Sequence, residues 1–197
     1  MKGGPVTPSY RAMIDYFSEV DPAIAASRYA LLPAKSVEFG KVDQPMLNHV
    51  RNGIWALAEL NEALIGLDSS AALTYEQLRQ AIALYAIHDL HKCVGRNWKE
   101  QFDISAELAQ TVAAEFCLIA FAPELTAADY QSVCVALHAE RGYHDEVSPL
   151  FTDLLRWLRL ADALASHETP VVTVSMQKAL DAVDAEMAFY YHRFQES

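Results

Sequence analysis

A histidine and an aspartate lie side by side, His88-Asp89, directly after an apolar run over residues 81–87. That run is too apolar for a surface helix, and buried charges are normally paired or bound to a metal ion. Neighbouring side chains on a helix point about 100° apart, so the pair contacts one ion only if the helix passes it tangentially. Further ligands must then come from other helices. The alternative is a capping or salt-bridged pair at the surface.

Two other helical segments carry candidate ligands. His49 lies upstream, and Asp162 lies downstream in the mostly apolar segment 158–166. The order His, His-Asp, Asp on successive helices resembles the HD metallohydrolase superfamily. Lys92 stands where that family's His-Asp-x-x-Lys pattern has its lysine, whereas His91 replaces a residue that is commonly small there. The resemblance implies a divalent metal site between central helices, with ligands His49, His88, Asp89 and Asp162.

Helical periodicity dominates the chain, and no segment alternates convincingly over strand length. A hydrophobic fraction of 52% in 197 residues is enough for one core. We therefore predict an all-α fold, an HD-domain-like helical bundle in a single domain over residues 1–197. It would comprise N-terminal helices and a loop (1–44), a metal-binding core (45–166) and a C-terminal helix (167–197). The predicted helices cover residues 9–19, 22–31, 45–64, 74–91, 105–121, 127–140, 148–166 and 173–194.

Cysteine use and apolar segments indicate the compartment. Cys93, Cys117 and Cys134 are widely spaced and fit neither a disulfide framework nor a zinc ribbon, so we expect reduced thiols in the core. The apolar run over residues 112–122 is too short to span a bilayer. The first residues lack the apolar segment of a secretory signal. These features predict a cytoplasmic protein without a membrane partner.

The formal net charge of −11 argues against a free-standing nucleic-acid binder. Affinity for a phosphate backbone comes chiefly from lysine and arginine side chains that release counterions. The charge does not exclude a nuclease, because divalent ions offset the carboxylates of a site and other subunits can supply a basic channel.

A narrower resemblance extends over residues 34–92. It consists of a Ser-Val-Glu-Phe loop (36–39), an Asp-Gln pair (43–44), the motif His49-x-x-Asn52-Gly53 and the His-Asp-x-x-Lys motif. Together these look like the N-terminal HD nuclease domain of the large subunit, the ten-d family, of subtype I-D CRISPR effector complexes. Members of that family are much longer, so the resemblance implies the nuclease domain alone. Its implied partners are DNA, the other subunits of a type I-D complex and its helicase.

The candidate ligands also suggest a chemistry by themselves. Two imidazoles and two carboxylates leave a divalent ion open positions for water and a phosphate oxygen, and Mn, Mg, Ni, Co and Fe all fit such a set. Lys92 would hold the phosphate electrostatically, or it is a solvated lysine at a helix end. Asn52 would contact substrate or position the helix of the first histidine, since asparagine is unfavourable inside a helix.

A second ion is a separate question. His138 and His144 flank a short segment at a predicted helix end, so both imidazoles could face one point. Each is either a ligand of a second ion or a polar residue at the helix end, because imidazole serves both purposes. With two ions bound, Asp89 would bridge them.

Three functions agree with these observations. The first is a metal-dependent DNA nuclease, preferably on single strands, in CRISPR type I-D interference and hence antiviral defence. The second is an HD phosphohydrolase acting on a nucleotide or another small phosphate ester. The third is a metal-binding but inactive docking module. An open groove favours the first, a closed pocket the second and an exposed apolar patch the third.

Overall fold

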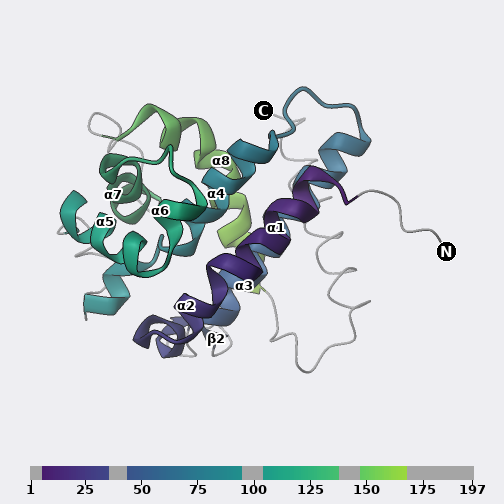
Figure 1. Ribbon diagram of the computed structural model, residues 1–197. Helices are drawn as coiled ribbons and strands as arrows, with labels where there is room; N and C mark the ends of the chain where they lie inside the picture. Colours follow the sequence, from purple (N-terminus) through teal and green to yellow (C-terminus); the bar gives the residue numbers. More distant parts are fainter. Residues whose placement is uncertain (1–5, 36–43, 95–103, 138–146, 168–197) are drawn as a thin grey trace.

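Helices form nearly all the regular structure of the computed structural model, which describes residues 6–35, 44–94, 104–137 and 147–167 (Figure 1). The prediction of an all-α bundle is confirmed. Among the described residues no helix has both the length and the apolar character needed to cross a bilayer. The elements are α1 (Pro8–Glu19), α2 (Asp21–Ala25), η1 (Arg28–Leu31), β1 (Pro33–Lys35), β2 (Gln44–Pro45), α3 (Met46–Gly66), α4 (Tyr75–Ala86), η3 (Leu90–Val94), α5 (Ala106–Glu115), α6 (Leu118–Phe121), α7 (Ala127–Ala136) and α8 (Pro149–His167).

Helix α4 connects two groups of helices. On one side α3 packs against α1 and α8, and in Figure 1 α1 crosses in front of α3. On the other side α5 packs against α6 and α7. Because α4 contacts α1, α3, α7 and α8, its C-terminal end lies where both groups meet. The predicted ligands lie on or beside α3, α4 and α8, so this packing decides whether they meet.

Two helices, α4 and α7, begin within one residue of their predicted starts, each with a capping box. Thr74 accepts a hydrogen bond from the backbone of Gln77, whose side chain bonds back to the Thr74 N–H. Thr126 and Asp129 form the same capping box at the start of α7. In both cases two N–H groups that the helix leaves unpaired are satisfied by side chains.

The helix predicted over residues 74–91 is correct only as far as Ala86. His88 and Asp89 lie in the turn that follows α4, before η3. The backbone there tightens to hydrogen bonds between residues three apart, as from the His88 N–H to the Tyr85 carbonyl at 3.3 Å. A turn presents the His-Asp pair, so the tangential helix expected from the sequence is not required.

The helix predicted over residues 105–121 is interrupted. Cys117 adopts a left-handed conformation with φ 61°, which ends α5 and redirects the chain into α6. This break leaves Cys117 exposed, so its expected place in the core was wrong, whereas Cys134 is buried. The side chain of Cys93 lies outside the described residues. Similarly, the helix predicted over residues 22–31 is divided into α2 and η1.

The non-periodic segment before α3 contains a short strand pair that the sequence did not predict. β1 and β2 are antiparallel, with Pro33 opposite Pro45. The Met46 N–H donates to the Leu32 carbonyl at 2.7 Å, which attaches this pair to the start of α3. The predicted loop over 36–39, Asp43, and the C-terminal helix over 173–194 lie outside the described residues.

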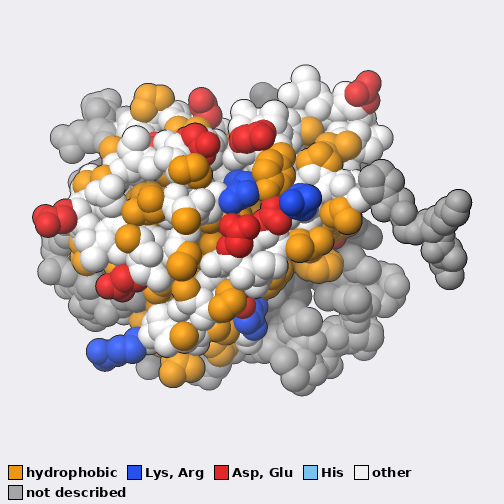
Figure 2. Space-filling model, viewed as in Figure 1, with side chains coloured by type: hydrophobic (Ala, Val, Ile, Leu, Met, Phe, Trp, Pro, Cys, Tyr) orange, Lys and Arg blue, Asp and Glu red, His pale blue; other side chains and the backbone are white. Residues whose placement is uncertain are grey.

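Charged side chains on the face that carries α1 pair with one another. Arg11 Nε donates to Asp15 Oδ1 at 3.1 Å. Nη2 of Arg79, on α4, lies 3.5 Å from Oε2 of Glu19. Figure 2 shows acidic and basic side chains together at the centre of this face, between separate hydrophobic patches. The lysine and arginine side chains described on this face form no continuous basic surface.

Gly53 allows a close approach of α3 and α4. A Cβ atom at this position would lie 2.0 Å from Cε1 of Tyr85, far inside van der Waals contact. Tyr85 is completely buried and belongs to the main core, so its ring has no free space to move into. Glycine at this position therefore fixes the distance between the two helices at the level of His49 and His88.

We predict that Gly53→Ala lowers the free energy of unfolding by about 1–3 kcal/mol, because overpacking forces the Tyr85 ring or a helix to shift. Gly66→Ala is the matched control, since a Cβ there meets nothing within 4 Å. Alanine is the better helix former, so the control is neutral or slightly stabilising. Urea unfolding followed by circular dichroism measures both. Equal stability of the two variants would contradict the packing argument.

Candidate metal centre

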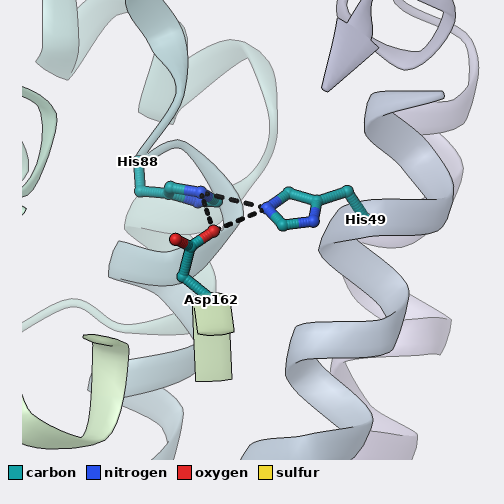
Figure 3. A group of neighbouring side chains, drawn as sticks. All are labelled: His49, His88 and Asp162. Atoms are coloured by element: carbon teal, nitrogen blue, oxygen red, sulfur yellow. Dashed lines mark hydrogen bonds and ion pairs between the residues drawn. The ribbon is translucent and has the colours of Figure 1, made fainter. Parts of the chain in front are cut away.

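Three side chains from separate parts of the chain converge on one point (Figure 3). His49 comes from α3, His88 from the turn after α4, and Asp162 from α8, and their ligand atoms all lie within 4.8 Å of one another. His49 Nε2 is 3.3 Å from His88 Nε2 and 3.0 Å from Asp162 Oδ1. His88 Nε2 is 3.6 Å from Asp162 Oδ1. Bonds of about 2.1 Å to one ion place neighbouring ligand atoms roughly 3 Å apart, so these separations suit a shared ion.

His88 is held in the orientation that a metal ligand needs. Its Nδ1 lies 2.6 Å from the Tyr85 carbonyl oxygen, which can only accept a hydrogen bond. Nδ1 therefore carries a proton, and in the neutral ring the lone pair belongs to Nε2. Nε2 is the atom that faces His49 and Asp162 (Figure 3). A backbone carbonyl that fixes the tautomer in this way is typical of histidine metal ligands.

His49 is kept in its neutral form by its surroundings. Burial lowers the pKa of His49; the contact with Asp162 opposes this change, and the neighbouring imidazole of His88 reinforces it. The side chain is fully buried, whereas that of Asp162 is 16% exposed. The neutral imidazole of His49, the Nε2 of His88 and one carboxylate therefore meet in a mostly buried site, with Asp162 on its more accessible side. Such a donor set suits a divalent ion.

Asp89 and Lys92 lie beside this group. Asp89 Oδ2 is 3.5 Å from His88 Nε2 and 2.5 Å from Lys92 Nζ. The Lys92 ammonium also donates to the Ala34 carbonyl at 2.7 Å, which joins β1 to the His-Asp turn. Asp89 is not part of the three-residue group, and its role as a fourth ligand stays a prediction. The phosphate contact expected of Lys92 also stays a prediction.

The other predicted site residues have mixed outcomes. Asn52 lies one turn after His49, and its buried Nδ2 has no hydrogen-bond partner among the described residues. Its substrate contact remains a prediction. His91 is buried, with Nε2 4.0 Å from Asp89 Oδ1. His138 and His144 lie outside the described residues, so the second ion site is also still a prediction.

Sequence reasoning missed two residues that shape the site. Tyr85 lies three residues before His88, its ring stacks on that imidazole, and its Oη is 3.3 Å from His49 Nε2. Gln44 is buried and donates from Nε2 to the Ala165 carbonyl at 3.1 Å, which joins β2 to the helix of Asp162. The helical spacing of Tyr85 from His88 was a usable signal. Gln44 belongs to the Asp-Gln pair of the narrower resemblance, but its contact with α8 gave no signal, because its partner is distant in sequence.

The geometry fits a divalent ion, and it is the only such group of three found among the described residues. Comparisons of the chain with profiles of known protein families, with curated proteins and with solved structures find no match.

We predict that the protein binds Mn²⁺ through this group and that Asp162→Asn weakens binding by at least about 100-fold, since removing even an outer partner of a ligand lowers affinity about 10–100-fold. Asp129→Asn is the matched control, because Asp129 is a buried carboxylate that caps α7. Calorimetric titration measures both. Unchanged affinity in Asp162→Asn would contradict the site.

A stoichiometry of two that drops to one in His138→Ala/His144→Ala would support the second site.

The lowered pKa of His49 predicts a pH dependence of stability. Below its usual pKa of about 6.5 the unfolded chain binds a proton that the folded chain excludes, so unfolding becomes easier as pH falls. The free energy of unfolding of the metal-free protein should therefore decrease from pH 7.5 toward acid. His49→Gln should reduce this slope by up to about 1.4 kcal/mol per pH unit. Urea unfolding in chelator measures it, and identical slopes in both proteins would refute the assignment.

Proposed function

We propose that this chain is a metal-dependent phosphodiester hydrolase of the HD type that acts as a DNA nuclease. The observation that supports this most is the convergence of His49, His88 and Asp162 within 4.8 Å. These are three of the four residues that the HD pattern names as ligands. The His-Asp pair, its lysine and the motif around His49 further support a relationship to the large subunit of type I-D CRISPR complexes.

The proposed chemistry assigns a task to each side chain. A divalent ion held by His49, His88 and Asp162 would lower the pKa of a bound water molecule and stabilise charge on the phosphoryl group. The two imidazoles suit this task because burial and a backbone hydrogen bond keep their lone pairs available. Asp162 supplies the negative charge that favours a divalent over a monovalent cation.

Lys92 can hold a phosphate while it keeps its structural contacts. An ammonium group has three N–H donors, and Asp89 Oδ2 and the Ala34 carbonyl accept two of them. The side chain is 24% exposed, more than any of the three ligands. Among the described residues no acceptor takes the third donor, which can therefore bind a phosphate oxygen, and Asp89 Oδ2 lies between the ammonium and His88 Nε2.

Substrate size separates this function from the second candidate. The ligand imidazoles are fully buried, so access to the group is narrow among the described residues. Narrow access favours a small phosphate ester such as a nucleotide, and among nucleic acids it favours a flexible single strand over a duplex. The net charge of −11 disfavours tight DNA binding by the chain alone. Efficient cleavage would then need a basic channel from partner subunits.

We predict that the protein cleaves single-stranded DNA when Mn²⁺ is added. Cleavage by the chain alone should be weak and should change little with salt, because few cationic groups contact the phosphates and release counterions. Asp162→Asn and Asp89→Ala should reduce the rate at least about 100-fold, by analogy with the loss of other essential site groups. Asp129→Asn should keep it. The assay compares single-stranded DNA, duplex DNA and a nucleotide panel.

Two results would contradict the nuclease proposal, and a third would contradict only the role of Asp89. Turnover of free nucleotides without cleavage of single-stranded DNA would assign the site to a small-molecule phosphohydrolase. Metal binding without turnover of any substrate would favour a docking module. Full activity of Asp89→Ala at matched metal concentration would remove that carboxylate from the machinery.

A further inference from the structure

Tyr85 is a buried residue of the site for which the proposed chemistry gives no role. Its ring stacks on the imidazole of His88, with centroids 4.5 Å apart and planes 24° apart. Its Oη lies 3.3 Å from His49 Nε2, the hydrogen-bond partner of this hydroxyl among the described residues. Since the ring is packed against the Gly53 backbone, the hydroxyl is held at the metal group and cannot turn away.

Metal binding would remove this partner. A neutral imidazole nitrogen has either one proton or one lone pair in the ring plane, and a metal ion occupies the lone pair of Nε2. The Tyr85 hydroxyl can then neither donate to His49 nor accept from it. A fully buried hydroxyl without a partner is unfavourable, so another acceptor in the loaded site would stabilise this group.

We propose that the Tyr85 hydroxyl donates a hydrogen bond to an oxygen atom of a phosphate group bound at the metal centre. The inference rests on the proposed function, because it requires a metal ion held by His49, His88 and Asp162. A phosphate beside the carboxylates of Asp162 and Asp89 needs hydrogen-bond donors, and Tyr85 approaches from the side of His49. A tyrosine hydroxyl is protonated at neutral pH, so it can donate to such an oxygen.

Tyr85→Phe tests this role because it keeps the ring, its stacking on His88 and its fit against Gly53. Two affinities are measured with the full chain. The affinity of the metal-free protein for Co²⁺ is measured from the visible absorption of the bound ion. The affinity of the Co²⁺-loaded protein for inorganic phosphate is measured from the change in that absorption. We expect Tyr85→Phe to weaken phosphate binding about 10-fold or more, as for loss of a hydrogen bond to a charged group. Co²⁺ binding should stay equal or become tighter, because the hydroxyl no longer competes for His49 Nε2.

Tyr130→Phe is the matched control. It removes the hydroxyl of another buried tyrosine, on α7, which makes no hydrogen bond among the described residues. Both affinities should equal those of the unmodified protein. Folding of each variant is checked by thermal unfolding, and both should remain folded because no packing atom of the ring is removed.

The outcomes separate this proposal from the proposed function. Unchanged phosphate affinity in Tyr85→Phe would overturn the role of the hydroxyl. Parallel weakening of Co²⁺ and phosphate binding would also overturn it, since it would mean that Tyr85 only supports the histidines. Co²⁺ binding without phosphate binding in the unmodified protein would refute the phosphate contact and keep the metal site. Absence of Co²⁺ binding would refute the metal site itself, and the inference with it.

Discussion

The close contact between Gly53 on α3 and the Tyr85 ring on α4 is the constraint on which the site depends. A single Cβ atom would lie 2.0 Å from the ring, so no other residue type fits without movement. His49 precedes Gly53 by about one turn, and His88 follows Tyr85 by three residues. The packing of the Tyr85 ring against Gly53 therefore sets the distance between α3 and α4 at which the two histidine Nε2 atoms lie 3.3 Å apart. The histidines do not have to draw the helices together.

The surroundings of the converging residues fix the state of both histidines. The Tyr85 carbonyl selects the tautomer of His88, and burial keeps His49 neutral. Two short strands link the group to the rest of the fold, since Lys92 donates to a carbonyl of β1 and Gln44 of β2 donates to α8. Positions fixed by packing and by such outer hydrogen bonds are what a hydrolytic metal site requires. This arrangement is why we favour an enzyme over a docking module.

Much of the fold follows from the sequence, because helix starts and apolar periodicity are local properties. The sequence predicted the starts of α4 and α7, and both ends of α3 and α8, within about two residues. The turn at His88-Asp89 was not, because its tightened backbone depends on packing at the junction of both helix groups. The break at Cys117 was also missed, since a left-handed conformation at a residue other than glycine leaves little trace in the sequence.

The three residues that converge were predictable from the sequence, but their environment was not. His49, His88 and Asp162 were chosen from the sequence and do meet, whereas the contact of Asp89 with Lys92 and the place of Tyr85 depend on the tertiary structure. Anomalous diffraction from crystals grown with Mn²⁺ tests directly whether these three residues bind a metal ion. We predict an anomalous density peak within bonding distance of Nε2 of His49, Nε2 of His88 and Oδ1 of Asp162. No peak at these three atoms, or Mn²⁺ bound only elsewhere on the chain, would contradict this prediction.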